Sequence, residues 1–158
     1  MATADEFMDL FEIRAARSEE AASVAALVGV AYAKFIGRIG RKPAPMLADY
    51  PELIARGVVY VVSGAKRLRA VLVMLRQGDH LFLENIAVHP DDQGRGFGRQ
   101  LMTCVDQHAK LLGLDAVDLY TNELMTENLA FYLHLGFVEI DRRTEDGFQR
   151  VFMRKVLA

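Results

Sequence analysis

The sequence predicts an α+β fold, with a mixed, mostly antiparallel central sheet of about seven strands and helices on both faces. Three β-branched, apolar runs follow one another over residues 58–90 with only short turns between them, which is typical of an antiparallel meander. A strand–helix–strand passage after them indicates one parallel crossover within the sheet. Apolar residues at helical spacing precede the meander. The expected element order is β-α-α-β-β-β-α-β-α-β-β.

The first part of the chain predicts one strand and two helices. "FEIRAAR" (11–17) reads as a strand, and Ser18-Glu19-Glu20 suits a helix start through capping and the helix dipole. Helical spacing of apolar residues continues to about Ile36. Two glycines and two prolines predict a loop over 37–45, and a shorter helix over about 46–56 is expected to stop at Gly57.

The middle of the chain predicts the meander. Its strands are expected at 58–64, 68–78 and 80–90, separated by the turn signals "SGAKR" and "QGD". A helix is predicted over 97–113, where Leu101, Val105 and other apolar residues share one broad face.

The last part of the chain alternates strands and a helix. We expect a strand at 115–121, a helix at 126–136 that ends on glycine, and strands at 137–143 and 148–157. The final strand is expected at a sheet edge, where such strands often pair across a dimer, so the sequence suggests a homodimer.

Composition limits the class of protein. Residues 1–158 fit one domain, with 52% hydrophobic and 25% charged residues. A net charge of −2 gives no basic field for nucleic acid or an anionic membrane. One cysteine excludes an internal disulfide and favours a reducing compartment. "MATADEFMDLFEIR" is not a signal peptide, and no run approaches the roughly eighteen apolar residues of a membrane span. We therefore expect a soluble, cytoplasmic protein.

The stretch "HPDDQGRGFGRQLM" (89–102) carries the main functional signal. Gly94, Gly96 and Gly98 stand at alternate positions between a strand end and a helix start, with Arg95 and Arg99 beside them. Free N–H groups and the helix dipole form an anion site there, and missing Cβ atoms allow close approach. The arginines add charge-assisted donors. The loop therefore predicts a phosphate-bearing ligand, although a glycine-rich turn can also be a mere tight connection.

Two familiar phosphate loops do not fit. A P-loop ends in Gly-Lys-Ser/Thr, whereas this loop has Gly98-Arg99-Gln100. A dinucleotide fingerprint needs its third glycine one position later and an acidic residue at the end of the next strand, whereas the predicted strand 115–121 ends in threonine.

The pattern that matches is Gln-x-x-Gly-x-Gly. "QGRGFG" (93–98) after "IAVHP" (86–90) resembles the acetyl-CoA-binding motif of the GCN5-related N-acetyltransferase (GNAT) superfamily. "TENLAFYLHLGF" (126–137) is similar to the second motif of that family, with an asparagine, a helix that carries a tyrosine, and a terminal Gly-Phe. Both motifs occur in order, and the expected element order agrees with this family.

The resemblance implies transfer of an acetyl group from acetyl-CoA to a primary amine by direct attack, with coenzyme A as product. It implies that the strand before the loop parts from its parallel neighbour and that the cofactor arm lies in the gap. Backbone groups of Ile86, Ala87 and Val88 would hold that arm, and the N–H of Val88 would stabilise the tetrahedral intermediate. The pyrophosphate would be bound by N–H groups of the loop and by arginine: Gln93, Gly94, Arg95, Gly96, Phe97, Gly98 and Arg99.

Two proton transfers need side chains. By resemblance Tyr132 is the general acid to the leaving thiolate, because a phenol is protonated at neutral pH; the alternative is that it only packs. Our candidate for the general base is Glu84, which strand alternation places on the face of Phe82, Ile86 and Val88. In well-known histone-acetylating members the glutamate lies at the position of Phe82, so Glu84 can instead be structural or bind substrate.

Several further residues have assigned or excluded roles. Tyr120 and Glu123 are reserve candidates for the base. Asn128 resembles the family's cofactor-contacting asparagine, although many members place it where Met125 stands, and Asn122 is the alternative. Cys104 is expected to be a buried thiol without a catalytic role. The histidines have no metal-ligand spacing, so no metal is expected: His80, His89, His108 and His134.

The acceptor is not specified by the sequence. Arg38, Arg41 and Lys42 in the loop 37–45 are candidates to recognise a carboxylate or phosphate on the acceptor, and Tyr120 is a further candidate for the acceptor groove. The alternative for the cations is a solvated basic loop. A small-molecule or a peptide amine would fit. The competing function is a non-catalytic acyl-CoA-binding sensor, which would need neither Tyr132 nor Glu84.

Overall fold

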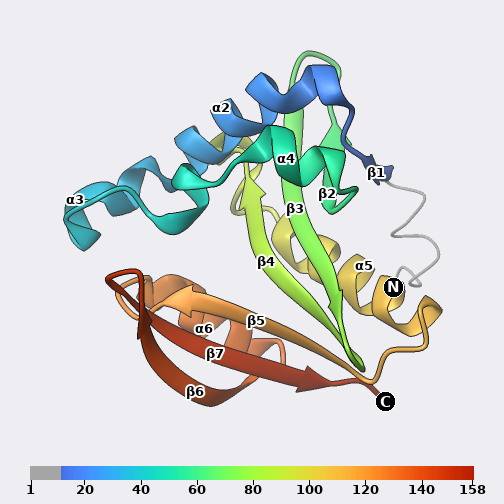
Figure 1. The fold of residues 1–158 in the computed structure, drawn as a ribbon, viewed down its shortest axis with the longest axis vertical. Helices are drawn as coiled ribbons and strands as arrows, with labels where there is room; N and C mark the ends of the chain where they lie inside the picture. The colour runs from blue at the N-terminus through green and yellow to red at the C-terminus, as the bar shows by residue number, and fades with distance from the viewer. Residues whose placement is uncertain (1–11) are drawn as a thin grey trace.

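A seven-stranded sheet runs through the computed structural model, which describes residues 12–158 (Figure 1). The strand order is β1-β2-β3-β4-β5-β7-β6. All neighbouring strands are antiparallel except β4 and β5, so the mixed, mostly antiparallel sheet and the single parallel crossover are confirmed. The strands are β1 (Ile13–Ala15), β2 (Val59–Ser63), β3 (Leu68–Gln77), β4 (His80–Val88), β5 (Ala116–Asn122), β6 (Val138–Glu145) and β7 (Phe148–Val156).

Helices cover both faces of the sheet, as predicted. One face of β2–β4 lies under α2 and α4, while α5 and α6 pack on the opposite face (Figure 1). The α-helices are α2 (Ala21–Tyr32), α3 (Ile36–Ile39), α4 (Tyr50–Ala55), α5 (Phe97–Leu111) and α6 (Thr126–His134). The 3-10 turns are η1 (Ser18–Glu20), η2 (Ala33–Phe35), η3 (Ala44–Leu47) and η4 (Pro90–Asp92).

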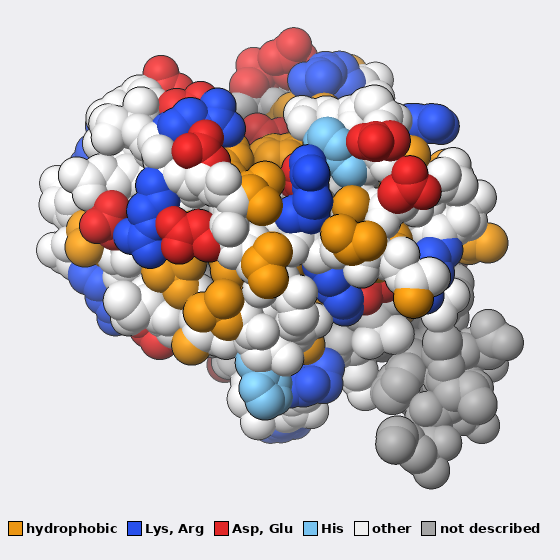
Figure 2. All heavy atoms as spheres, turned by 90° about the horizontal axis from the view of Figure 1, so that it is seen from below, with side chains coloured by type: hydrophobic (Ala, Val, Ile, Leu, Met, Phe, Trp, Pro, Cys, Tyr) orange, Lys and Arg blue, Asp and Glu red, His pale blue; other side chains and the backbone are white. Residues whose placement is uncertain are grey.

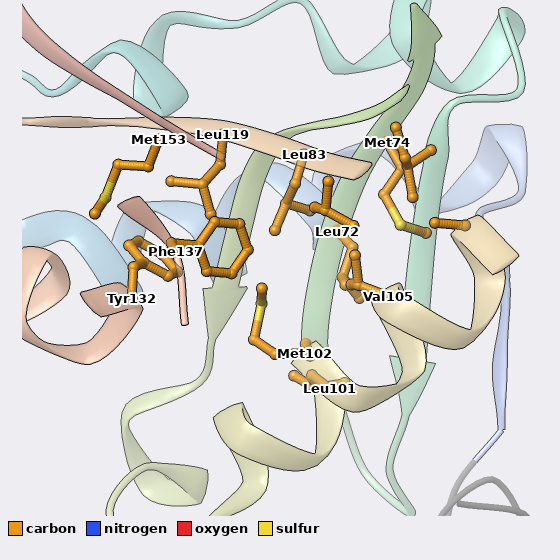
Figure 3. Packing of buried hydrophobic residues seen from close by; sticks show 14 of the residues in the cluster. Leu72, Met74, Leu83, Leu101, Met102, Val105, Leu119, Tyr132, Phe137 and Met153 are labelled. Carbon is orange, nitrogen blue, oxygen red and sulfur yellow. The ribbon is translucent and has the colours of Figure 1, made fainter. Parts of the chain in front are cut away.

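Each face of the sheet has its own hydrophobic core. Figure 3 shows part of the core between the sheet and α5 and α6, where Leu72 and Leu83 of the sheet point toward Leu101 and Val105 of α5. Phe137, which follows α6, is 1% exposed and fills the space beside Leu119. The second core packs α2 and α4 on β2 and β3. These two layers fix β4, which borders both, as a rigid strand.

The final strand is not at the edge of the sheet. β7 pairs with β5 on one side and with β6 on the other, so β6 is the edge strand. The hairpin folds back and inserts its second strand beside β5, which adjacency along the chain does not reveal. The reason for expecting a homodimer through the last strand is therefore removed.

The edge strand β6 carries features that oppose pairing with another chain. Glu139 separates its exposed Val138 and Ile140 and forms an ion pair with Arg142, further along the strand. Figure 2 views the molecule from the side of β6 and β7, and it shows acidic and basic side chains interspersed among hydrophobic ones. Charged side chains of this kind protect an exposed edge from association.

The helical segment before the sheet is longer than predicted. Helical and 3-10 turns continue from Ser18 to Ile39, and Gly40 ends them with a φ of 86° and an N–H bond to the carbonyl of Ile36. The glycines of "GRIG" therefore belong to a helix and its C-terminal cap rather than to a loop. The next helix, expected from residue 46, begins at Tyr50 because Asp49 accepts the N–H of Glu52 and caps it.

The run Ser18–Ile39 is long and apolar enough to cross a membrane by length and composition alone, although the sequence analysis expected no such run. In the structure its buried side chains, among them Val24, Leu27, Val28 and Phe35, form the second core on the sheet. The run therefore serves here as a core helix.

Residues 1–11 lie outside the described part of the chain. The expected beginning of the first strand at Phe11 and the absence of a signal peptide in the acidic N-terminal segment concern these residues. The described strand β1 begins at Ile13.

An ion pair joins β1 to the turn that starts α2. Arg14 donates two hydrogen bonds to Glu20, at 2.7 and 2.9 Å, and the same carboxylate accepts the N–H of Arg17 at 2.8 Å. The hydrogen bond from Arg14 is the main cause that lowers the pKa of Glu20 to about 2. This contact fixes the point at which the chain enters α2.

Replacement of Glu20 by Gln is expected to lower the free energy of unfolding at pH 7 by about 1 kcal/mol, the upper end for ion pairs at the surface, because the pair with Arg14 is partly buried. The folded-state pKa of Glu20 is depressed, so its contribution is present above the ordinary carboxyl pKa and is lost as the pH falls through about 2. Urea denaturation of both proteins at pH 7 and at about pH 2 measures the difference.

Glu19→Gln is the matched control, because Glu19 is the exposed neighbour and, among residues 12–158, its side chain is hydrogen-bonded to the Ser18 hydroxyl alone, at 3.4 Å. A loss in Glu19→Gln equal to that in Glu20→Gln, or a difference that persists at about pH 2, would contradict the assignment.

Candidate active site

Strands β4 and β5 separate halfway along their length. Their parallel pairing runs from His80 and Ala116 to Leu83 and Leu119 and then stops, although both strands continue. The gap that the family resemblance implied therefore begins directly after Leu83.

A β-bulge lies at the point of separation. Val73 of β3 pairs with Asn85, and the next residue, Met74, pairs with Leu83, so Glu84 is the extra residue between them. A bulge bends its strand and increases the local twist. It therefore turns the end of β4 away from β5 and opens the gap.

The edge of β4 offers backbone donors to the gap. His89 donates its N–H to the carbonyl of Arg69 in β3, at 2.9 Å, so Ala87, two residues earlier, also faces β3. Backbone groups of alternate residues point to opposite sides of a strand, and those of Ile86 and Val88 therefore face the gap.

Both carbonyl groups on this edge lie within hydrogen-bond distance of a side-chain donor, although Tyr32 shares its one proton between Ile86 and Asn85. The Tyr32 hydroxyl lies 2.9 Å from the carbonyl of Ile86, and Gln93 Nε2 donates to the carbonyl of Val88, also at 2.9 Å. The N–H groups of Ile86 and Val88 remain to bind the acceptor atoms of a ligand.

The glycine loop ends in a helix without a side-chain cap. Gly94 and Gly96 both have a φ of 80°, a conformation that favours glycine, and Gly96 is the N-cap of α5. Gln100 bonds back to the carbonyl of Gly96 at 3.1 Å, whereas the N–H groups of Gly98 and Arg99 have no acceptor among residues 12–158. These N–H groups and the helix dipole favour an anion at this point.

Gly98 differs from the other two glycines in what surrounds the position of its missing Cβ atom. A Cβ atom at Gly98 would lie 3.6 Å from the ring of Phe131, which is an ordinary contact, whereas one at Gly94 or Gly96 would enter open space. A ligand can therefore approach the loop closely on the side of Gly94 and Gly96. The positive φ of these two residues explains why they are glycines.

A cleft joins the edge of β4 to the glycine loop. Its lining includes most of the residues that the sequence predicted for the cofactor: Ile86, Ala87, Val88, Gln93, Gly94, Gly96, Gly98, Arg99 and Asn128. Two predicted side chains do not line it. Arg95 is exposed, and the ring of Phe97 is buried in the core under the guanidinium of Arg69, at 4.2 Å. Lys34 of η2 lines the cleft and supplies a cation that sequence reasoning missed.

A second pocket adjoins the cleft on the other side of the bulge. It lies between the turn at Pro43–Pro45, the end of β5 and the start of β7. Four residues line both hollows: Tyr32, Ile86, Asn128 and Tyr132. A group held in the cleft therefore meets a group held in the pocket at this junction.

Tyr132 lies at the junction, as its predicted role requires. Its ring is 6% exposed and packs against Phe131 and Phe137, with ring centroids 5.5 and 5.8 Å away. Burial raises the pKa of the Tyr132 hydroxyl. The hydroxyl makes no hydrogen bond within the described part of the chain, so it is available to a ligand.

Glu84 lines the second pocket but does not share a face with Ile86 and Val88, contrary to the prediction from alternation. The bulge at Glu84 reverses the alternation, so that Ile86 and Val88 pack on the core under α5. Glu84 remains on the face of Phe82, whose ring stacks on Tyr120 at 5.7 Å. The carboxylate therefore faces the pocket rather than the cleft.

Two of the three predicted cations of the N-terminal loop tie it to the segment across the pocket. Arg38 forms an ion pair with Glu127 and donates to the carbonyl of Leu124, at 3.1 Å. Arg41 donates to the carbonyl of Asp146, at 3.1 Å, and stacks over Phe148, at 4.1 Å. Neither lines the pocket, because each is occupied by the segment across it. Lys42 does not line the pocket either, and a contact of these cations with the acceptor stays a prediction.

The remaining candidates are distributed as follows. Asn128 lines both hollows, while Asn122 lines the pocket and uses Oδ1 to accept the N–H of Leu124, at 2.9 Å. Tyr120 lines the pocket, but burial raises its pKa, which makes it a poor base. Glu123 does not line the pocket.

Sequence reasoning missed a buried hydrogen-bond network beneath the pocket. The Tyr32 hydroxyl lies 2.8 Å from Asn85 Oδ1, Asn85 Nδ2 donates to the Tyr50 hydroxyl at 3.1 Å, and Tyr50 donates to the carbonyl of Pro45 at 2.6 Å. The network joins α2, β4, α4 and the turn over the pocket. The available signal was Asn85, an uncharged polar residue beside Glu84 in a mostly apolar strand.

Sequence reasoning also missed Arg150 of β7, which lines the pocket with a side chain only 14% exposed. Its guanidinium stacks on the ring of Tyr120, at 4.4 Å. Alternation along the strand placed Arg150 on one face with Phe148 and Phe152, but the assumption of an edge strand hid its position over the site.

Two other kinds of chemistry at this site would involve a metal ion or a cysteine nucleophile. Among residues 12–158, no three His, Cys, Asp or Glu side chains gather in a way that would hold a metal ion. Cys104 of α5 is buried and lines neither hollow, and burial raises the pKa of its thiol.

The chain is similar to known acetyltransferases. The pattern of a family described as Acetyltransferase (GNAT) domain matches residues 55–139. Over 87 residues the chain is 32% identical to the uncharacterized N-acetyltransferase YvbK of Bacillus subtilis, covering 54% of this chain and 56% of the relative. Over 81 residues it is 37% identical to mouse N-alpha-acetyltransferase 80, covering 51% of this chain and 24% of the relative. The matches thus span about half the first relative and a quarter of the second.

Solved structures share the fold. The PaiA N-acetyltransferase of Thermoplasma acidophilum, crystallised in complex with coenzyme A, superposes with a TM-score of 0.74 at 15% identity. The match covers 92% of this chain and 98% of that one. At this identity the likeness concerns the fold alone.

Proposed function

Because the chain belongs to the family of GNAT acetyltransferase domains, we propose that it transfers an acetyl group from acetyl-CoA to a primary amine of a small molecule or peptide. The observation that carries the proposal is the junction at Tyr132, which lines both the cleft and the pocket. A donor of the acetyl group in one hollow and an amine in the other would meet there.

The cleft suits coenzyme A. The N–H group of Val88, which lines the cleft only, is positioned to bind an amide carbonyl of the pantetheine arm. The uncapped start of α5, with Lys34 and Arg99 in the lining, suits the pyrophosphate. Acetyl-CoA supplies an activated thioester that an amine can attack directly.

Three groups of the chain would serve the reaction. The N–H of Ile86, which lines both hollows, would stabilise the negative charge that develops on the thioester oxygen, in place of the Val88 N–H expected from the sequence. The Tyr132 hydroxyl would donate a proton to the leaving thiolate, since its raised pKa keeps it protonated at neutral pH. Glu84, which faces the pocket, would accept a proton from the substrate ammonium, directly or through a water.

Replacement of Gly96 by Glu is expected to weaken acetyl-CoA binding at least tenfold, about 1.4 kcal/mol. The new side chain would extend into the open space at the loop and repel the pyrophosphate. Isothermal titration calorimetry with acetyl-CoA measures the affinity.

The matched control is Gly78→Glu in the turn between β3 and β4. Gly78 also has a positive φ, 62°, and open space around its Cβ position, but it lies outside the cleft. Both substitutions impose similar backbone strain, so only Gly96→Glu should lose affinity. A folded wild-type protein that does not bind acetyl-CoA would overturn the proposed function.

Tyr132→Phe is expected to lower kcat about 100-fold while KM for acetyl-CoA changes little, because the ring still packs and only the proton donor is lost. Release of free thiol measures the rate. Tyr60→Phe is the control, since Tyr60 packs against His108 on the far side of α5 and lines neither hollow. Equal rates in Tyr132→Phe and Tyr60→Phe would remove Tyr132 from the chemistry and favour a non-catalytic domain that binds acyl-CoA.

Glu84→Gln is expected to depress the rate most near neutral pH, where the acceptor arrives as an ammonium ion, and less near about pH 10, where the amine is already deprotonated. A pH–rate profile of both proteins tests this. Glu123→Gln serves as control because Glu123 lies outside the pocket. If the profile keeps its shape in Glu84→Gln, or changes in Glu123→Gln, the base is another group.

A further inference from the structure

Arg150 carries unused hydrogen-bond donors into the pocket. Its Nε is buried and has no partner, and the guanidinium makes no hydrogen bond to any residue of the described range 12–158. A guanidinium has five N–H donors, and buried donors are nearly always satisfied in native proteins. A side chain with so little exposure therefore points to a missing partner.

The contacts that Arg150 does make leave its donors free. Its guanidinium lies over the ring of Tyr120, and Phe148 is 5.9 Å away, so these contacts involve the face of the planar group. Glu145 is 3.7 Å from Nη1, longer than a hydrogen bond, and its side chain is 39% exposed. Stacking on aromatic rings fixes the orientation of the guanidinium and leaves its edge for a ligand.

The charges around the pocket have a simple arrangement. Among its described lining residues Arg150 is the one cation and Glu84 the one anion. Asn122, which pairs with Arg150 in the register of β5 and β7, uses its Oδ1 in the turn and has no partner for Nδ2 among residues 12–158. The pocket thus presents a carboxylate for an ammonium group and a cluster of donors for an anion.

We infer that the acceptor carries a carboxylate in addition to its amine, and that Arg150 binds this carboxylate. The inference rests on the proposed function and specifies its substrate class. The two oxygens of a carboxylate match the planar fork of the guanidinium, which is the usual bidentate arrangement. Arg38 and Arg41 do not compete for this role, because neither lines the pocket: Arg38 is paired with Glu127, and Arg41 donates to the carbonyl of Asp146. The carboxylate can belong to a free amino acid or to an acidic residue of a peptide.

The test compares acceptors with and without the carboxylate. Common L-amino acids and their amides, and the amides of Asp-Asp-Asp and Ala-Ala-Ala, are assayed for thiol release from acetyl-CoA. We expect an acceptor with a carboxylate to exceed its uncharged counterpart at least tenfold in kcat/KM. A preference for free amino acids identifies the first source, and a preference for the acidic tripeptide the second.

Arg150→Met is expected to remove this preference by raising KM for the carboxylate-bearing acceptor at least tenfold, with the uncharged acceptor changed less than twofold. Arg150→Lys keeps the charge without the fork and should retain part of the preference. Arg143→Met is the matched control, because Arg143 pairs with Arg150 in the register and stacks over Phe152, at 3.9 Å, but lies outside the pocket.

Three outcomes would overturn the inference. Uncharged acceptors could have the same kcat/KM as their carboxylate-bearing counterparts, or none of the carboxylate-bearing acceptors could give thiol release. Arg150→Met and Arg143→Met could also have equal effects on KM. Titration with acetyl-CoA separates this failure from that of the proposed function. If one of these outcomes is seen while acetyl-CoA binds the wild type and Arg150→Met equally, only the inferred substrate class is wrong. If it does not bind the wild type, the proposed function fails as well.

Discussion

The separation of β4 from β5 is the constraint on which the rest of the site depends. Neighbouring strands normally satisfy each other's backbone groups, and here they stop doing so after Leu83 and Leu119. The bulge at Glu84 opens the gap, and side chains from other elements then take the freed carbonyl groups. What remains is an edge of N–H donors in the middle of the sheet. The two cores on either face hold that edge in place, so it does not close on itself.

The bulge also separates two chemical environments. On one side lies the cleft with its glycine loop and two cations, and on the other lies the pocket with one carboxylate and one guanidinium. Tyr132 lies between them in an apolar setting, and its hydroxyl has no hydrogen-bond partner in the described residues 12–158. The network through Asn85 fixes the wall of the pocket from below, since it connects α2 to the turn at Pro45. Each hollow therefore has its own charge and its own structural support.

Local patterns in the sequence predicted the elements and the glycine loop well, because hydrophobic periodicity, glycine positions and short turns act locally. Gly94 and Gly96 were identifiable because few other residues adopt their backbone conformation. Three features were not predictable in this way. Alternation failed at Glu84 because a bulge is defined by the partner strand. β7 was misplaced because hairpin insertion depends on the whole sheet. Arg38, Arg41 and Arg150 look alike in sequence, and only tertiary contacts decide which of them lines the pocket.

The bond from Arg41 to the carbonyl of Asp146 joins segments 105 residues apart and closes the rim of the pocket from two sides. Neither segment takes part in the cleft. Mutations in either one can therefore remodel the rim while the glycine loop and the edge of β4 stay intact. Selection can therefore act on the two hollows separately. Homologous proteins can change the acceptor that the pocket binds while the cleft stays the same.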